Sequence, residues 1–347
     1  MIKLQRAFVT GVQRAESRED LYPYLQNAIE LEHATIPPYL TAMFSLKPSN
    51  AGIARLIGTI VRQEMLHMTI AANVLNAIGG HPQTNKPEFI PKYPGPLPMS
   101  IGGTGFEVGI AAFSKPLLET VFMKIEEPEH PIPVKRALAA APDQYATIGE
   151  FYEAIMAKIR ALGDRIFVPA AVERQVLTWF PRDQLYPITN VETACSSLEI
   201  IVLQGEGTNT DPMLHPGDPA HYYKFGEIVA GRRIVKRGTG WAYAGEPIPY
   251  DEGGVYPMKA NPTLAGFPRG SQARTRAEQF AYNYTSLLNA LQRAFNGEPA
   301  HIDVVIGLMY DLKVMAVALM STPLWDGNGM NAGPCYEYVT ALSAAES

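Results

Sequence analysis

The feature that most constrains the fold of this chain is the presence of acidic residues on the apolar faces of predicted helices. In the helix predicted over residues 51–78, apolar side chains recur at three- and four-residue spacing, and Glu64 and His67 occupy two positions of that stripe. Side chains three residues apart on a helix project from adjacent turns toward one point. An ionised carboxylate in a protein core is strongly unfavourable unless it is paired or binds a metal ion. Glu64 and His67 are therefore predicted to be metal ligands.

Three further predicted helices carry a glutamate on the same kind of stripe. Glu32 interrupts the apolar face of the first long helix, and Glu126 lies four residues after an apolar Phe122 near the end of the third. Glu206 ends the fourth, between two glycines, and Glu199 two turns earlier is the alternative on that helix. Because few basic residues share these stripes, pairing within the core does not explain the acids.

The histidines leave more than one interpretation open. The position three residues after Glu206, where a second Glu-x-x-His pair is expected, is Asn209. His221 opens a later helix and is either the sixth ligand or a polar residue of its first turn. His33 lies near the edge of the first stripe and is either a ligand or a core histidine. His215 is a weaker candidate, and Glu129 and His130 are interpreted as solvating a helix end.

Four carboxylates and one or two imidazoles are the donors that non-haem iron or manganese prefers, and four carboxylates balance two divalent cations. The sequence therefore predicts two divalent metal ions, iron ahead of manganese. The predicted ligands are Glu32, Glu64, His67, Glu126, Glu206 and His221. No separate catalytic residue is identified.

Helical periodicity dominates the rest of the chain, and 29 glycines and 29 prolines supply long connections between the helices. The predicted helices cover residues 21–46, 51–78, the stretch from Ser114 to Pro128, 148–162, 191–206, 218–230, 271–295 and 302–320. The predicted fold class is all-α, a four-helix bundle with extra helices and long Pro/Gly-rich connections. Thr147 and Glu150 form a capping box that predicts the start of one helix at Ile148.

The predicted domain organisation has three parts that together form one compact domain. They are a dimetal-carboxylate bundle over 1–230, an irregular lid-like segment over 231–270 and C-terminal helices packed on the bundle over 271–347. Trp241, Tyr243 and Tyr250 either line an apolar pocket in the lid-like segment or pack within their own loop.

Composition excludes several classes of protein. With 29 basic and 34 acidic residues the net charge is −5, which argues against nucleic-acid binding. The two cysteines are far apart and fit a reducing compartment. The N-terminus opens no signal-peptide run, and the apolar stretch 304–320 contains Asp311 and Lys313, so no membrane span is expected. A cytoplasmic location is the expectation.

Five short blocks, at residues 30–40, 63–68, 125–128, 148–152 and 204–207, resemble the ferritin-like domain of the iminophenyl-pyruvate dimer synthases. That family includes the large enzymes of violacein and rebeccamycin biosynthesis, which couple two imines derived from indolepyruvate. The resemblance covers roughly residues 20–230. It implies a ferritin-like bundle with a dimetal carboxylate site, but the much longer additional region of the pigment enzymes is missing here.

These features favour a non-haem dimetal oxidase or oxygenase that uses dioxygen on a small organic molecule. An amino-acid-derived imine of secondary metabolism is one substrate class that the resemblance implies. The alternatives are a ferritin-like iron-binding or ferroxidase protein and a metal-free interaction module. Long insertions at 81–114 and 231–270 would obstruct the packing of a ferritin cage. The sequence allows a homodimer, although no predicted helix face marks its interface.

Overall fold

The structure is a computed structural model. It describes residues 4–101, 103, 105–128, 145–208, 211–324 and 328–341. Glu129, His130 and Asn209, which the sequence analysis singled out, lie outside the described residues.

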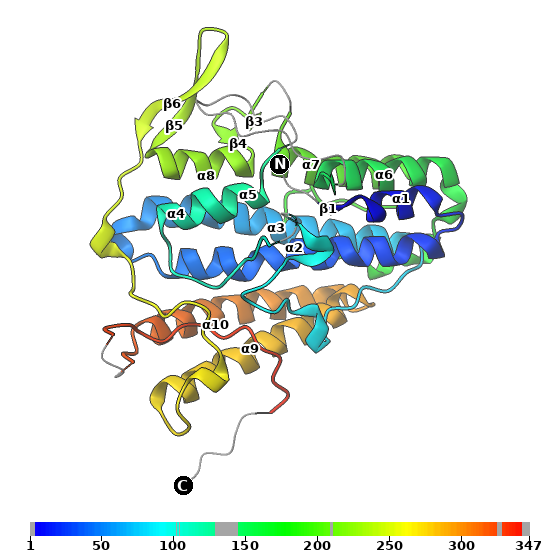
Figure 1. Ribbon diagram of the computed structural model, residues 1–347. Helices are drawn as coiled ribbons and strands as arrows, with labels where there is room; N and C mark the ends of the chain where they lie inside the picture. The colour runs from blue at the N-terminus through cyan, green and yellow to red at the C-terminus, as the bar shows by residue number, and fades with distance from the viewer. Residues whose placement is uncertain are drawn as a thin grey trace.

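The centre of the molecule is a pair of long helices, α2 (Tyr22–Phe44) and α3 (Ala51–Ala77), which lie side by side along most of their length (Figure 1). Helix α2 is buried without interruption from Leu31 to Ala42, and α3 from Leu66 to Ala77. A six-residue connection joins them, as expected for neighbouring helices of opposite direction. This pair forms one half of a four-helix bundle.

The other half of the bundle is built from shorter helices placed end to end. On one side α6 (Ile148–Leu162) and α7 (Val191–Glu206) pack together, and α1 (Arg6–Arg14) covers α6. On the other side α8 (His221–Ala230) packs against a helix made of α4 (Lys115–Leu117), a π turn and α5 (Met123–Ile125). The short helices thus form two lines, and each line has a break near the middle of the bundle (Figure 1).

Local sequence explains where several helices begin. Thr147 accepts the backbone N–H of Glu150 while the Glu150 carboxylate accepts that of Thr147, so the predicted capping box is present. Asn190 caps α7 in a similar way by accepting the N–H of Thr193. The all-α fold class predicted from periodicity is confirmed.

Helix α2 contains two prolines, Pro37 and Pro38, and a side chain from outside the helix replaces one of the hydrogen bonds that they remove. Pro38 has no N–H to donate to the carbonyl of Ala34, four residues earlier. The hydroxyl of Tyr93 donates to that carbonyl at 2.6 Å and replaces the lost hydrogen bond. The helix is therefore continuous through Pro37 and Pro38.

The C-terminal helices α9 (Gln272–Phe295) and α10 (Ile302–Met320) form a hairpin on the side of α2 and α3 away from the short helices (Figure 1). Phe280 and Leu288 of α9 belong to the same continuous core as the bundle. The division of the chain into three parts stays a prediction. Within the described residues, no helix has both the length and the apolar character needed to cross a membrane.

Strands are few and short. The antiparallel pairs are β1 (Leu4–Gln5) with β2 (Tyr145–Ala146), β3 (Met213–His215) with β4 (Asp218–Pro219), and β5 (Arg232–Arg237) with β6 (Gly240–Pro247).

Three sequence-based expectations about individual elements need correction. The helix predicted over 218–230 begins only at His221, because Asp218 and Pro219 pair with β3. The segment 231–270 is not irregular throughout, since β5 and β6 form an ordered hairpin that projects from the bundle (Figure 1). Helix α1 was not predicted at all.

The aromatic residues of the 231–270 segment pack locally. Tyr243 lies against α8, where Gly226 leaves room for its ring. Lys236 lies over the Trp241 ring, and Tyr250 contacts Phe113 with ring centroids 5.4 Å apart. Trp241 thus packs within its own segment, as in the second of the two interpretations given above, whereas Tyr243 and Tyr250 pack against other parts of the chain.

Candidate metal centre

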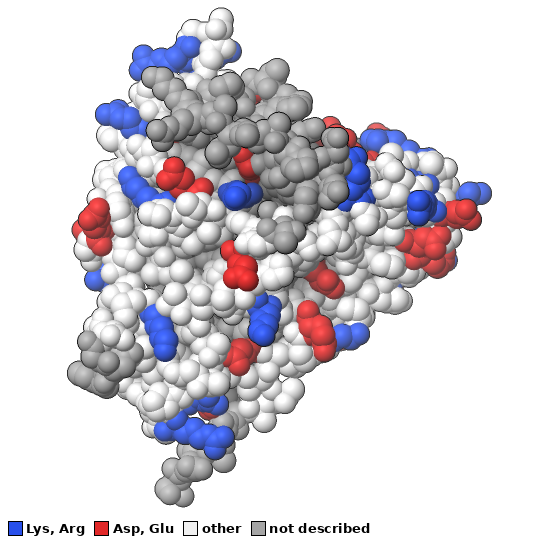
Figure 2. Space-filling model, in the orientation of Figure 1, with Lys and Arg blue, Asp and Glu red and all other residues white. Residues whose placement is uncertain are grey.

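Three glutamates and two histidines meet in the core where the two short-helix lines are interrupted. Glu32 comes from α2, Glu64 and His67 from α3, Glu126 directly follows α5, and His221 begins α8. The glutamates are only 5%, 3% and 7% exposed, and the two histidines are buried as well. By contrast, Figure 2 shows the surface acids of this face interspersed with basic side chains. The buried cluster is therefore unlike the ordinary surface acids.

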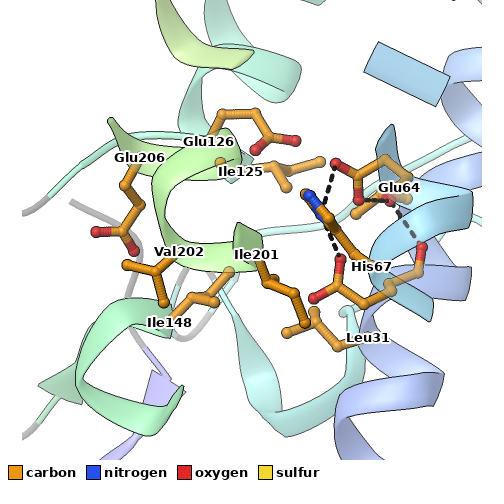
Figure 3. A pocket seen from close by; sticks show the side chains of 12 residues that line it. Leu31, Glu64, His67, Ile125, Glu126, Ile148, Ile201, Val202 and Glu206 are labelled. Carbon is orange, nitrogen blue, oxygen red and sulfur yellow. Dashed lines mark hydrogen bonds and ion pairs between the residues drawn. The ribbon is translucent and has the colours of Figure 1, made fainter. Parts of the chain in front are cut away.

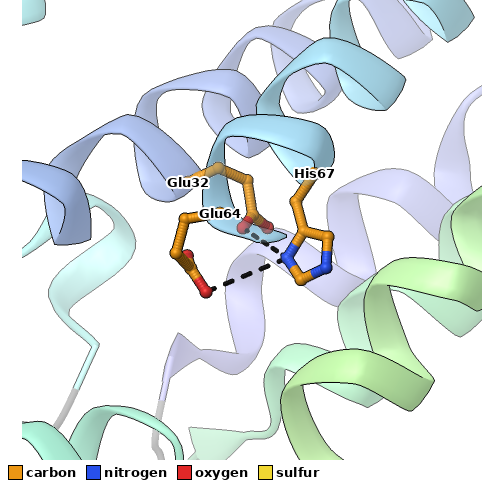
Figure 4. Close-up of side chains that lie close together, drawn as sticks. All are labelled: Glu32, Glu64 and His67. Carbon is orange, nitrogen blue, oxygen red and sulfur yellow. Dashed lines mark ion pairs between the residues drawn. The ribbon is translucent and has the colours of Figure 1, made fainter. Parts of the chain in front are cut away.

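The five side chains form two groups that share Glu64. In the first group, His67 Nδ1 lies 3.3 Å from Glu32 Oε2 and 3.9 Å from Glu64 Oε1 (Figure 4). In the second, His221 Nδ1 lies 2.8 Å from Glu64 Oε1 and 3.4 Å from Glu126 Oε2. The two imidazole rings stack at 5.5 Å. Each group offers three ligand atoms to one point.

Each of the three carboxylates accepts a hydrogen bond from a side-chain hydroxyl on one oxygen and directs the other oxygen toward the histidines. The donor–acceptor pairs are Tyr152 with Glu32 at 2.5 Å, Thr35 with Glu64 at 2.8 Å and Tyr39 with Glu126 at 2.5 Å. Burial, together with the neighbouring carboxylates, raises the pKa of Tyr39 and of Tyr152 well above 10, so both phenols stay protonated donors. The orientation of each carboxylate is thus fixed by a hydroxyl group that belongs to neither Glu/His group.

Each histidine is held by a glutamine. His67 Nε2 lies 3.0 Å from Gln204 Oε1, and His221 Nε2 lies 3.2 Å from Gln63 Oε1. An amide oxygen can only accept, so with a proton on Nε2 the Nδ1 atom of each ring is left to bind a metal ion. This is the arrangement that metal-binding histidines commonly show.

The electrostatics of the cluster favour a bound cation. Burial raises the pKa of Glu64 well above its usual value of 4.5, and repulsion by Glu126 and Glu32 raises it further. His221 Nδ1 has no hydrogen-bond partner among the described residues, and Glu64 Oε1 lies 2.8 Å from it. A metal ion shared by such atoms would satisfy both, so the residues fit the dimetal centre expected from sequence.

The remaining predicted ligand, Glu206, is placed differently. Its Oε1 accepts the backbone N–H of Gly149 at 2.8 Å, in the first turn of α6. Its carboxylate points away from Glu64 and His67 (Figure 3), and it belongs to neither of the two groups found among the described residues. Glu206 still lines the same small cavity, so its role as a ligand stays a prediction. The alternative, Glu199, is exposed on α7.

The cavity at the cluster is small, and acidic and apolar side chains share its lining. Its volume is about 30 Å³, enough for a molecule or two of the size of water. The hydrophobic lining consists of Leu31, Ile125, Ile148, Ile201 and Val202 (Figure 3). Such a lining keeps bulk water away from the acidic cluster.

A family model described as ferritin-like matches residues 25–230. The chain belongs to the ferritin-like family. The matched region contains all five side chains of the buried cluster, so the cluster lies in the ferritin-like part of the chain.

Two known proteins can be compared with this ferritin-like chain. The dichlorochromopyrrolate synthase of Lentzea aerocolonigenes is 23% identical over 404 aligned positions, which cover 92% of this chain and 36% of that synthase. The chain thus spans little more than a third of that relative. The crystal structure of a ferritin-like protein from Caulobacter vibrioides superposes with a TM-score of 0.59 at 23% identity, covering 91% of this chain and 97% of that one. The second comparison supports the fold alone.

The other two histidines considered from sequence lie outside the cluster of this ferritin-like protein. His33 faces α9, where its Nε2 lies 2.6 Å from the Tyr284 hydroxyl, and burial lowers its pKa to about 3. His215 is exposed on β3. His33 therefore matches the core-histidine interpretation.

Several supporting residues were not assigned a role from sequence. Tyr152 belongs to a block that the family resemblance includes, yet nothing in its helix indicates that its hydroxyl reaches Glu32 on α2. Gln63 is adjacent to Glu64 in the sequence and Gln204 lies two residues before Glu206, and this proximity was the available signal. Tyr39 lies seven residues after Glu32 on the same helix face, and its hydroxyl contacts Glu126.

Proposed function

We propose that this ferritin-like protein is a metal-dependent oxidoreductase, a dimetal oxidase or oxygenase that acts with dioxygen on a small organic molecule. The observation that supports this best is the pair of buried Glu/His groups joined through Glu64. Two such groups with one shared carboxylate provide for two adjacent divalent cations. Iron is the first candidate and manganese the second, because the donor set suits both.

In this proposal Glu32, Glu64 and His67 hold one ion, and Glu64, Glu126 and His221 hold the other. Glu206 remains a proposed additional ligand. Two reduced iron ions, when bound, supply electrons for the reduction of dioxygen.

The protein residues keep the site ordered and dry. The amide oxygens of Gln204 and Gln63 accept from Nε2–H of the two histidines, which leaves both Nδ1 atoms available to the metal ions. The hydroxyls of Tyr152, Thr35 and Tyr39 fix the carboxylates. The apolar cavity lining limits water, which strengthens every electrostatic interaction inside.

An amino-acid-derived imine is the substrate class that we propose to test first. It is supported by the sequence resemblance to the iminophenyl-pyruvate dimer synthases and by the similarity to a dichlorochromopyrrolate synthase. Because that similarity covers only 36% of the synthase, the substrate of the synthase is not transferred to this chain.

The test begins with anaerobic loading of the purified protein with ferrous iron and elemental analysis. About two ions per chain are expected in the wild type, and none in Glu64→Gln. His215→Gln is the matched control, since His215 is exposed and distant from the cluster. Oxygen consumption is then measured with and without imines generated from aromatic amino acids.

The outcomes separate the proposed functions. Oxygen uptake that depends on an added organic substrate supports the oxidase. Rapid oxidation of iron that no organic substrate changes, with a cage-sized particle on size-exclusion chromatography, would favour a ferroxidase instead. A chain that binds no metal even after reconstitution would overturn the enzyme proposal and leave a metal-free interaction module.

A further inference from the structure

A groove lies between α3 and α10, on a different face of α3 from the metal ligands. We call it the α3–α10 groove and define it by a floor of Leu40, Met43, Val61, Met65, Phe180 and Met309. Its volume is about 470 Å³, within the range of about 300–1,000 Å³ that is typical of small-molecule sites. Two adjoining hollows of about 390 and 320 Å³ extend it, because they share wall residues with it.

The groove is separate from the metal centre. Arg62 and Met65 flank Glu64 in sequence, but residues adjacent on a helix do not share a face. None of the described residues that line the groove also lines the small cavity beside the acidic cluster. A ligand of the groove would therefore bind without touching the metal ligands.

The glycine at position 58 contributes to keeping the α3–α10 groove open. It lies in the interior of α3, where glycine destabilises a helix by about 1 kcal/mol relative to alanine. A Cβ atom at this position would lie 3.2 Å from Met43 Sδ, at the floor of the groove. A larger side chain at Gly58 would occupy the groove, so the glycine keeps it open at a cost to helix stability.

The rim of the groove and its extensions carries an excess of positive charge. Arg55, Arg62 and Lys313 are exposed there, and none of them has a salt bridge or side-chain hydrogen bond within the described residues. The acidic side chain that lines the same hollows, Asp218, is paired with Lys224 at 2.8 Å. An uncompensated basic rim stands out in a chain whose net charge is −5.

We propose that the α3–α10 groove binds an amphipathic carboxylate, with its apolar body on the methionine- and phenylalanine-containing floor and its carboxylate at Arg62 and Lys313. Methionine side chains adapt to apolar bodies of different shape, and three of them, Met43, Met65 and Met309, line this floor. Arginine binds carboxylates through charge-assisted hydrogen bonds. An apolar floor with a cationic rim matches a molecule that has both parts.

The proposal is tested by isothermal titration of the purified protein with dodecanoate. One molecule is expected to bind per chain, and dodecyltrimethylammonium, which has the same tail and the opposite charge, is expected not to bind. Replacing both rim cations, Arg62→Gln with Lys313→Gln, is expected to weaken binding of dodecanoate by about tenfold or more. Lys259→Gln, which removes an exposed cation outside the groove, is the matched control and is expected to change nothing.

A second series tests the groove floor. Gly58→Leu is expected to abolish binding by filling the space, and Gly58→Ala is expected to weaken it while keeping α3 intact. Circular dichroism verifies the fold of each variant. The proposal would be overturned if the wild type did not bind dodecanoate. It would also be overturned if the rim variant and Gly58→Ala both bound dodecanoate as tightly as the wild type does. Since no metal or turnover enters the assay, its failure is distinct from failure of the proposed function.

Discussion

The two halves of the candidate metal centre are built from different parts of the bundle. The first half, Glu32 and His67 with the shared Glu64, projects from the interior of the long helices α2 and α3. In the second half, Glu126 and His221 lie at the ends of short helices, directly beside the interruptions of the bundle. One half is therefore held by continuous helices, and the other depends on how chain ends and loops are packed.

The side chains that hydrogen-bond to the ligands come mostly from the other part of the bundle than the ligands that they hold. Tyr152 of α6 and Gln204 of α7 hold the ligands from the long helices. Tyr39 of α2 and Gln63 of α3 hold those at the short-helix ends. Thr35 of α2 is the exception, since it holds Glu64 of the neighbouring long helix α3. The other four supporting residues each orient a ligand of the opposite layer, so the complete centre requires that the two layers are packed together.

The second half has one further difference, the buried Lys224. Its Nζ donates to Gln63 Oε1 at 2.7 Å and pairs with Asp218 at 2.8 Å, and burial lowers its pKa. The lysine fixes the orientation of the Gln63 amide, which in turn orients His221. We infer that the second half needs this extra support because its ligands lie at helix ends.

The largest effect is expected from the residue that both halves share. Glu64→Gln removes a charge from both groups, so the variant is expected to lose both metal ions, whereas the wild type is expected to hold about two per chain. Elemental analysis after anaerobic loading measures this. A variant that still bound one ion would show that Glu64 does not join the two halves.

Removing one histidine separates the halves. His67→Ala and His221→Ala are each expected to retain about one ion per chain, and His215→Ala to retain both. Under a graded chelator challenge, the ion left in His67→Ala is expected to leave faster, because its ligands lie at helix ends. Equal rates of loss in the two variants would contradict the proposed difference between the halves.

Smaller effects are expected from the glutamines. Gln204→Leu and Gln63→Leu remove the acceptors that orient His67 and His221, and loss of such a partner typically weakens metal binding about 10–100-fold. Competitive titration with a chelating dye measures each affinity. The effect of each variant is expected to be confined to its own half, and weakening of both ions by either variant would show that the glutamines act on the whole centre.

The smallest effect concerns the metal-free protein and its pH dependence. The pKa of Glu64 is raised in the folded state, so its contribution to stability is fully present below the unfolded value of about 4.5 and is lost as pH rises through the folded pKa. Chelator-treated wild type is therefore expected to lose thermal stability relative to Glu64→Gln as pH increases. Thermal denaturation across this range measures the difference, with Glu199→Gln as an exposed control. A constant difference would argue against a strained acidic cluster.

Sequence signals within a helix were sufficient to predict most of the helices. They were not sufficient where the structure of a segment depends on contacts with residues far away in the sequence. Helices α6 and α7 were predicted with the observed bounds, because the Thr147–Glu150 capping box and Gly207 mark their ends in the sequence itself. Helix α1 was missed because its burial depends on packing against α6, far along the chain.

The same distinction applies to the centre. Glu32, Glu64 and His67 were found because a helical stripe fixes which way they face. The position of His221 depends on the chain between α7 and α8, so periodicity left its role open. Glu206 lies on an inward stripe, but the N-terminal turn of α6 offers its carboxylate a backbone N–H that no sequence pattern indicates.

The three hydroxyl groups that hold the carboxylates have a kinetic consequence. Any change in how Glu32, Glu64 or Glu126 coordinates must stretch or break a buried hydrogen bond of 2.5–2.8 Å. Bound ions would accordingly exchange slowly with those in solution, and the surroundings would reorganise little when their charge changes. Both properties suit ions that stay in place through many reaction cycles, whereas a storage protein must release its iron onward.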